Sequence, residues 1–199
     1  VSYNGKEGYL KTTKITSEAV TPMIKEKNRI ATLKNNLNID MDISVPSGLT
    51  LSDFKTVLSN NLSDKNKIFE QSAEYFYKAE QKYKINGIFL ASIGIHESAW
   101  GTSKIASDKN NLFGFTAYDS DPYNSATSFE NYENAINKVA EVLSTKYLHV
   151  AGTKISDDLT ATGTYFNGTT AKSVNVRYAS DTGWADKVFN YMQYLYNKL

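Results

Sequence analysis

The sequence contains no cysteine, and its 199 residues include only two histidines and three prolines. Without thiols, the chain cannot form disulfides, cysteine nucleophiles or thiolate metal sites. Two histidines are also too few for a typical catalytic zinc site. We therefore expect neither a metal ion nor an organic cofactor.

The chain also has no excess of positive or negative charge and no long apolar run. The formal net charge is +1, so no global field draws the chain to nucleic acid or to a membrane surface. No apolar stretch approaches the roughly 18 residues that a membrane span requires. We expect a monomer that binds neither nucleic acid nor membranes.

Composition divides the chain into three parts. Residues 1–15 are typical of a β-hairpin around Asn4-Gly5, and an opening of this kind suggests a fragment of a longer protein. Residues 16–48 form a weakly helical, charged segment that leads into the turn-rich linker "VPSGLT", which ends at Thr50. Residues 49–199 carry the clear helical patterns, and we expect them to form the working domain.

The working domain is predicted to be α+β and predominantly α-helical. Thr50 and Asp53 form a capping-box signature, and Asp64 is a candidate cap for the next helix. Asn86-Gly87 marks a break between two helices. The helix predicted after it is apolar on nearly every face, as expected of a central, buried helix. The predicted helices are 51–59, 65–85, 88–100, 132–147 and 184–198.

Two long loops lie between these helices, at residues 107–129 and 152–183. Both are rich in Gly, Asn, Ser, Thr and aromatic residues, which favour turns over regular elements. At most a few short strands are expected, within 116–129 or 154–177. We expect the two loops to line one cleft.

Glu97 is the single carboxylate in the apolar run "FLASIGIHESAWGTS". Helical spacing would place Trp100 and Gly101 on the same face as Glu97. A carboxyl group against an indole loses hydration, which favours the protonated form that a general acid needs. Within this run, "HESAW" begins like a His-Glu-x-x-His zinc motif, but Trp100 stands where the second histidine would be.

Several motifs occur in order around Glu97 and carry a family resemblance. The stretches "HESAWGTSKIASDKNNLFGFTAYDSDPYNSATSF" and "NVRYASDTGWADKVFNYM" closely resemble the endo-β-N-acetylglucosaminidases of glycoside hydrolase family 73, and most of all the catalytic domains of clostridial autolysins. The likeness covers roughly residues 49–199. The opening "YNGKEGYLKTTKI" is similar to the last strands of a bacterial Src-homology-3-like wall-binding module. The resemblance implies a lysozyme-like fold in a secreted, cell-wall-associated autolysin.

The activity that the resemblance implies is hydrolysis of the β-1,4 bond that follows N-acetylglucosamine in the glycan strands of peptidoglycan. Glu97 would protonate the leaving oxygen, with Tyr178 and Asp181 as further catalytic candidates. We expect the segment 175–184 to fold over the cleft so that Tyr178 faces Glu97. The expected substrate-binding residues are Trp100, Asn111, Phe113, Gly114, Tyr118, Asp119, Glu130, Tyr165 and Trp184.

The second catalytic group stays open at this point. Most glycosidases use two carboxylates, and Asp119, Asp121 and Glu130 are the candidates here. The acetamide of the substrate is the alternative. The activity has alternatives too: a lytic transglycosylase or muramidase on the same scaffold, or a glycan-binding module without catalysis. A pure binding module would not need the acid at Glu97.

Overall fold

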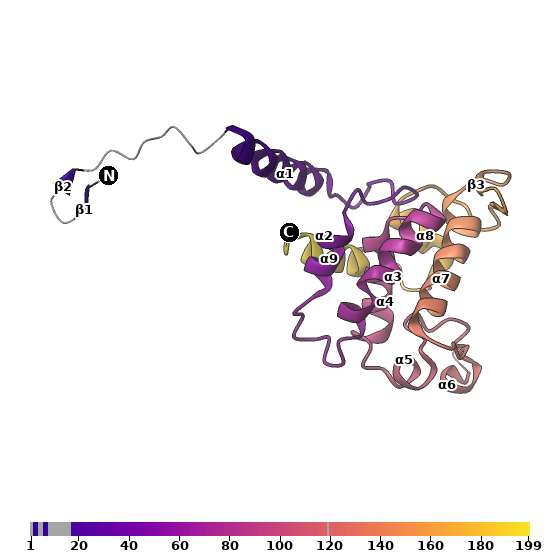
Figure 1. Cartoon of the computed structure of the whole chain (residues 1–199). Helices are drawn as coiled ribbons and strands as arrows, with labels where there is room; N and C mark the ends of the chain where they lie inside the picture. Colours follow the sequence, from indigo (N-terminus) through magenta and orange to yellow (C-terminus); the bar gives the residue numbers. More distant parts are fainter. Residues whose placement is uncertain (1, 4–5, 8–16, 119) are drawn as a thin grey trace. The chain divides into compact units, whose positions relative to one another are not determined.

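The computed structural model describes residues 2–3, 6–7, 17–118 and 120–199, and it places side chains from Thr21 onward (Figure 1). The chain divides into two compact units, Val1–Asn36 and Leu37–Leu199. In chain order the elements are β1 (Ser2–Tyr3), β2 (Lys6–Glu7), α1 (Ser17–Asn36), α2 (Leu51–Leu58), α3 (Ile68–Tyr83), α4 (Gly87–Ser98), α5 (Lys104–Lys109), α6 (Pro122–Ser125), α7 (Tyr132–Val142), a π-helix (Leu143–Leu148), β3 (Lys154–Ser156), β4 (Leu159–Thr160), α8 (Ala171–Tyr178) and α9 (Trp184–Tyr196).

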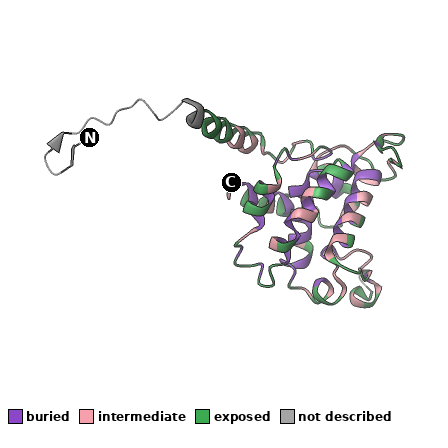
Figure 2. Cartoon of the chain, viewed as in Figure 1, coloured by how far each residue is buried: buried purple, intermediate pink, exposed green. Residues whose placement is uncertain are grey.

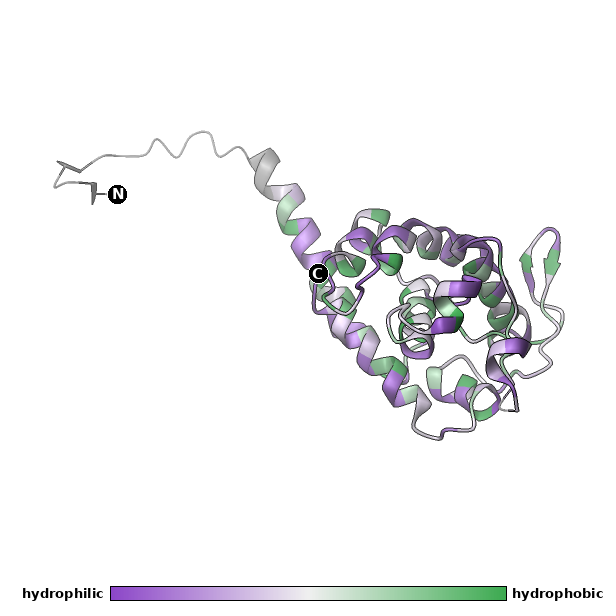
Figure 3. Cartoon of the chain, turned by 90° about the horizontal axis from the view of Figure 1, so that it is seen from below, coloured by the Kyte–Doolittle hydropathy of each residue, from purple (hydrophilic) through white to green (hydrophobic). Residues whose placement is uncertain are grey.

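The first unit holds one antiparallel strand pair and one helix. In the pair, Ser2 lies opposite Glu7 and Tyr3 opposite Lys6, while the predicted turn at Asn4-Gly5 lies outside the described residues. Helix α1 continues through Pro22. None of the residues 21–36 is buried (Figure 2), and hydrophilic and hydrophobic residues alternate along the helix (Figure 3). The assignment of residues 1–15 to a wall-binding module stays a prediction.

The second unit is built around α4, as the apolar run predicts. Every residue from Gly87 to Ile95 is buried, and Figure 2 shows buried helical segments at the centre of this unit. Helix α4 packs against α3 and α9, and α3 in turn packs against α2 and α7. Helices α3 and α9 thus cover the apolar helix α4, and the two-stranded β3–β4 hairpin is the only sheet of this unit within the described residues. The predominantly helical α+β class is confirmed.

The start of α4 explains the Asn86-Gly87 pair. The side-chain oxygen of Asn86 accepts hydrogen bonds from the backbone amides of Ile88 and Phe89, at 3.0 and 2.9 Å, and so caps the helix. A Cβ atom on Gly87 would lie 2.8 Å from Cζ of Phe54. The glycine therefore permits the close approach of α2 to the first turn of α4.

The second unit begins before residue 49, the start predicted for the working domain. Ile43 is fully buried; its amide donates to the carbonyl of Thr169 at 2.8 Å, and its carbonyl accepts from the amide of Asn86 at 2.9 Å. Residues 37–48 are thus tied to the unit that follows them. Apolar and polar residues alternate over residues 37–45, a pattern typical of a strand, yet no strand forms here and Ile43 alone of the apolar residues is buried.

Glu80 is a fully buried carboxylate on α3 that joins two chain segments. Its Oε2 atom accepts from the backbone amides of Ser47 at 2.9 Å and Gly87 at 2.7 Å. Burial raises the pKa of Glu80, although these hydrogen bonds act in the opposite direction. The carboxylate thereby fixes the end of the linker against the start of α4.

The raised pKa of Glu80 predicts a pH-dependent contribution to stability. A carboxyl with a raised pKa in the folded state stabilises the fold most below its ordinary pKa of about 4.5, and this contribution is lost as the pH rises through the folded pKa. We expect the unfolding free energy of the wild type, measured relative to Glu80→Gln, to fall between pH 4 and pH 8. A difference between the two proteins that stays constant over this range would contradict the prediction.

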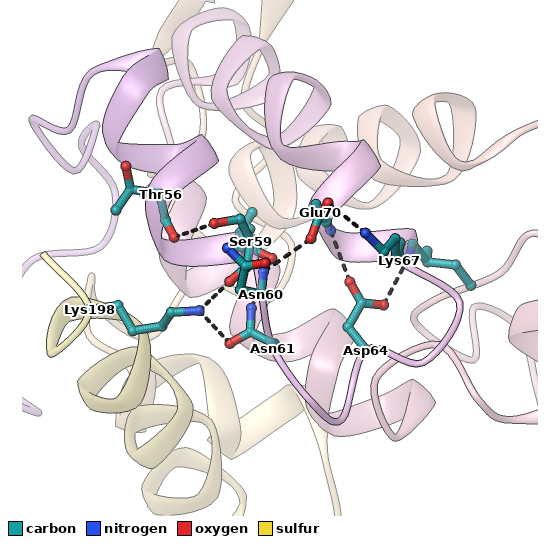
Figure 4. Close-up of polar contacts among 10 residues, drawn as sticks. Thr56, Ser59, Asn60, Asn61, Asp64, Lys67, Glu70 and Lys198 are labelled. Carbon is teal, nitrogen blue, oxygen red and sulfur yellow. Dashed lines mark hydrogen bonds and ion pairs between the residues drawn. The ribbon is translucent and has the colours of Figure 1, made fainter.

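The ends of several helices differ from the predictions. Helix α3 begins at Ile68 rather than at Lys65, because Asp64 turns back to accept from the amides of Ile68 and Glu70, at 2.8 and 2.9 Å (Figure 4). The capping box of α2 is confirmed at Thr50 and Asp53. Strands β3 and β4 fall in the second of the two intervals predicted for strands. Helices α5, α6 and α8 were missed because they are short and lie in Asn- and Ser-rich sequence.

Candidate active site

A cleft of about 490 Å³ opens at the C-terminal end of α4. Its walls come from the last turn of α4, the segment 113–117, the α7–π-helix region, and the chain from the end of α8 to the start of α9. Four segments that are far apart in the sequence thus meet around one hollow. The two long loops predicted to line a cleft contribute two of these walls.

Glu97 stands in the last turn of α4 and lines this cleft. Its Oε1 atom accepts a hydrogen bond from the indole Nε1 of Trp184 at 2.8 Å. Trp184 is only 2% exposed and packs edge-on against Phe89, with ring centroids 6.2 Å apart. A buried, immobile donor therefore fixes one carboxylate oxygen, while the side chain of Glu97 as a whole stays exposed to the cleft.

The indole beside Glu97 is not the one that helical spacing predicts. Helix α4 ends at Ser98, and both Ala99 and Trp100 adopt left-handed backbone conformations, with φ of 49° and 61°. Trp100 does not line the cleft; its ring packs against other aromatic rings at the far end of this turn. The predicted contact of Trp100 with Glu97 is wrong, because helical spacing holds only within a helix and α4 ends at Ser98.

The glycines around Glu97 serve the packing of the protein itself. A Cβ atom on Gly94 would lie 3.4 Å from Cε1 of Phe113, so the glycine makes room for a side chain that lines the cleft. Gly101 has a φ of +73°, and a Cβ atom there would lie 2.8 Å from Cδ1 of Ile68. The space that these two glycines leave near the end of the helix is filled by the side chains of Phe113 and Ile68.

Phe113 and Gly114 line the cleft as predicted, but Asn111 does not. Asn111 is fully buried beneath this turn. Its Oδ1 accepts from the amides of Phe113 and Phe115, at 3.2 and 2.9 Å, and its Nδ2 donates to the carbonyls of Phe115 and Thr127, at 3.1 and 2.9 Å. Asn111 is therefore a brace that shapes one wall, and its contact with substrate stays a prediction.

Tyr178 and Glu97 line the same cleft. Tyr178 is the last residue of α8, so the predicted loop 175–184 is helical in its first part and only residues 179–183 connect α8 to α9. The ring of Tyr178 lies 4.9 Å from that of Trp184 and 5.7 Å from that of Tyr147, measured between centroids. Burial, and then the negative charge of Glu97, raise the pKa of the Tyr178 hydroxyl. This phenol is therefore a neutral O–H donor at physiological pH.

Asp181 also lines the cleft but is engaged elsewhere. Its Oδ2 forms an ion pair with Nζ of Lys187 at 2.6 Å, and its Oδ1 accepts from the amide of Gly183 at 2.9 Å. The bond with Lys187 and the bond from Gly183 lower the pKa of this exposed carboxyl. Asp181 is thus an ionised group that holds the α8–α9 connection, and it is poorly suited to donate a proton.

The remaining predicted residues that the structure describes do not line the cleft. Tyr118 is 64% exposed, Glu130 accepts from Nδ2 of Asn134 at 3.2 Å, and Asp121 caps α6. Tyr165 packs on Tyr147, with centroids 5.0 Å apart, and so supports a ring that does line the cleft. Asp119 lies outside the described residues.

Several cleft-lining residues were not predicted, and three of them carry rings: His96, Phe115 and Tyr147. His96 and Phe115 are direct neighbours of predicted residues, which was an available signal. Tyr147 lies in the π-helix and belongs to no motif. Among the described residues, no group of three or more His, Asp or Glu side chains is arranged to hold a metal ion.

Comparison with known proteins places this cleft in a family. The sequence model of the glucosaminidase family, described as mannosyl-glycoprotein endo-beta-N-acetylglucosaminidase, matches residues 73–197. The chain therefore belongs to the glucosaminidase family, glycoside hydrolase family 73. The matched segment contains every cleft-lining residue described above.

Two curated relatives are similar over this region. A Streptococcus pneumoniae protein, provisionally assigned as an endo-β-N-acetylglucosaminidase, is 36% identical over 138 residues, which cover 69% of this chain and 19% of that protein. A Bacillus subtilis β-N-acetylglucosaminidase is 31% identical over 140 residues, covering 64% of this chain and 15% of that protein. The chain thus spans about a fifth of the length of the curated relatives it matches.

Solved structures share the fold. Staphylococcus aureus autolysin E, solved as a catalytic mutant with the disaccharide NAG-NAM, matches with a TM-score of 0.54 and 23% identity over 85% of this chain and 78% of that one. S. aureus glucosaminidase B matches with a TM-score of 0.55 and 18% identity over 100% of this chain and 78% of that one. The predicted lysozyme-like fold is confirmed. The clostridial origin stays a prediction.

Proposed function

We propose that this chain is the catalytic region of a cell-wall glycosidase that hydrolyses the β-1,4 bond following N-acetylglucosamine in peptidoglycan. The observation that carries the proposal is Glu97, a carboxyl group exposed in a cleft and oriented by the indole of Trp184. Family membership and the NAG-NAM disaccharide bound by autolysin E support the choice of substrate.

In this proposal, Glu97 delivers its proton to the oxygen of the leaving sugar. The hydrogen bond from Trp184 holds one carboxylate oxygen in place, so the carboxyl group does not have to be oriented during the reaction. General acid catalysis of this kind typically contributes about a hundredfold to ten-thousandfold. Phe113, Phe115 and Tyr147 offer apolar ring surfaces to the sugar faces.

The neutral hydroxyl of Tyr178 is the group proposed to position water or the substrate acetamide. Among the described residues, Glu97 and Asp181 are the only carboxylates that line the cleft, and Asp181 is bound to Lys187. We propose that the second catalytic group is either Asp119, which the described residues do not include, or the acetamide of the substrate. Either choice leaves Glu97 as the acid.

We expect Tyr178→Phe to lower turnover on cell walls at least about tenfold, equivalent to about 1.4 kcal/mol of transition-state stabilisation. The change keeps the ring that packs on Trp184 and Tyr147, so the melting temperature should barely change. Tyr75→Phe on α3, outside the cleft lining, is the matched control. Unchanged turnover in Tyr178→Phe would show that the hydroxyl takes no part in the reaction.

A lytic transglycosylase is the second candidate. Such an enzyme needs a single acid, and the described cleft lining holds one carboxylate outside an ion pair. Digestion of purified cell walls separates the candidates by the ends it creates. New N-acetylglucosamine reducing ends support the proposed hydrolase, anhydromuramic ends support the transglycosylase, muramic acid reducing ends support a muramidase, and no release supports a binding module.

The biological setting follows from the same proposal. A peptidoglycan hydrolase works outside the cell membrane, so we propose a secreted, cell-wall-associated protein that acts as a monomer. In the described part of the chain, no helix has both the length and the apolar character needed to cross a membrane. Residues 1–15 would be the end of a wall-binding module and 16–36 a linker, and the predicted catalytic domain 49–199 would include residues 37–48 as well.

A further inference from the structure

A second cavity, of about 400 Å³, lies beside α9 and shares no lining residue with the cleft. It is lined by five residues: Ser63, Trp100, Asn190, Tyr191 and Tyr194. We call this set the tyrosine platform. It contains the Trp100 indole that the sequence placed at the active site.

The rings of the tyrosine platform meet edge to face. Trp100 lies 6.2 Å from Tyr191 and 5.9 Å from Tyr194, with interplanar angles of 80° and 83°. Trp100 is nearly buried and forms the floor, whereas Tyr194 is 45% exposed. The other two lining residues supply an amide and a hydroxyl, and none of the five is charged. Flat apolar faces with neutral hydrogen-bonding groups around them suit a neutral sugar ring.

The wall that faces α9 is held rigidly by polar contacts. Asn61, two residues before Ser63, accepts from the hydroxyl of Tyr194 at 2.9 Å and from Nζ of Lys198 at 2.8 Å. Lys198 also donates to the carbonyl of Ser59, and Nδ2 of Asn61 donates to the carbonyl of Leu58 at 2.8 Å (Figure 4). These bonds fasten the α2–α3 connection to the end of α9. The shape of the cavity is therefore set before any ligand arrives.

The tyrosine platform adjoins the active-site cleft through one side chain. His96 lines the cleft, and its ring lies 6.2 Å from the ring of Tyr191. A glycan strand that leaves the cleft past His96 would next meet Tyr191. Free peptide stems are a poorer fit, because their charged ends would find no charged partner among the lining residues.

We propose that the tyrosine platform binds an N-acetylated sugar residue of the same glycan strand whose cleavage occurs at Glu97. The sugar ring stacks on Tyr191 or Tyr194, and its acetamide and hydroxyl groups bond to Asn190 and Ser63. This inference rests on the proposed function for the identity of the ligand. Its consequence is that long strands bind more tightly than short ones.

The two tryptophans of the chain give one spectroscopic probe for each site. Trp184 touches the acid in the cleft, and Trp100 forms the floor of the tyrosine platform. We would titrate the Glu97→Gln protein, which should not cut the ligand, with chitobiose and with chitohexaose, and follow both indole N–H resonances by NMR. Chitobiose should shift the Trp184 signal at lower concentrations than the Trp100 signal, whereas chitohexaose should shift both signals together.

Substitutions in the same background separate stacking from indirect effects. We expect Tyr194→Ala to weaken chitohexaose binding by about threefold to tenfold, the range typical of one aromatic contact, and to leave chitobiose binding unchanged. Asn190→Glu should also weaken chitohexaose binding, because it places a charge in the cavity. The position is exposed and helical, so the rings should stay in place. Tyr75→Ala is the control. Equal affinity of all these proteins for chitohexaose would overturn the inference.

The outcomes also distinguish this inference from the proposed function. If wild-type protein releases N-acetylglucosamine ends from walls while the tyrosine platform variants bind chitohexaose normally, the inference is wrong and the function stands. If no ends are released but Tyr194→Ala still weakens chitohexaose binding, the tyrosine platform stands and the proposed hydrolase does not.

Discussion

Glu97→Gln is expected to lower the turnover of cell-wall glycan by about a hundredfold to ten-thousandfold, the range that general acid catalysis provides. The amide can still accept the hydrogen bond from Trp184 at the position of Oε1, so the cleft should keep its shape. An amide cannot give a proton to the leaving oxygen, and this alone accounts for the loss. Release of reducing ends from purified walls is the measurement.

The stability of this variant should stay within about 0.5 kcal/mol of the wild type, because the side chain is exposed. Glu130→Gln is the matched control, since Glu130 is also exposed but lies outside the cleft lining. Its turnover should be unchanged. Near-normal turnover in Glu97→Gln would mean that another residue is the acid, and a large loss in Glu130→Gln would point to a second carboxylate.

The fold could be predicted wherever the information is local. The capping box at Thr50, the break at Asn86-Gly87 and the apolar run of α4 each depend on residues within a few positions of one another. These features produced the correct class and the correct central helix. Asp64 shows the limit, because its contacts with Ile68 and Glu70 shorten α3 in a way that a capping rule does not reveal.

The candidate site was less predictable because its partners are distant in sequence. Glu97 and Trp184 are 87 residues apart, and nothing near either residue indicates that their side chains meet. Trp100 was the indole within helical reach, yet left-handed residues at 99 and 100 turn it towards α9. The family resemblance supplied Trp184 as a site residue, while helical spacing alone selected the wrong tryptophan.

Asn111 is where the structure and the motif reading give opposite predictions. If Asn111 contacted substrate, its replacement would weaken glycan binding and leave the unfolding free energy unaffected. As the buried brace observed here, it makes four hydrogen bonds to the backbone on both sides of the Phe113–Phe115 turn. Alanine would take this partner from the amides of Phe113 and Phe115 and from the carbonyl of Thr127, whereas the carbonyl of Phe115 keeps the amide of Thr127 as a donor. Unsatisfied buried groups cost about 1–3 kcal/mol each, less where water can enter.

We therefore expect Asn111→Ala to lose about 2–4 kcal/mol of unfolding free energy and to melt at least about 5 °C lower. Activity should fall with it, because Phe113 and Gly114 would no longer be held in the cleft wall. Asn111→Asp can still accept from the amides of Phe113 and Phe115, but its ionised form would face two carbonyl oxygens. Its stability should recover as the pH is lowered and the carboxyl becomes a donor. An unchanged melting temperature in Asn111→Ala, together with weaker glycan binding, would instead favour direct contact with substrate.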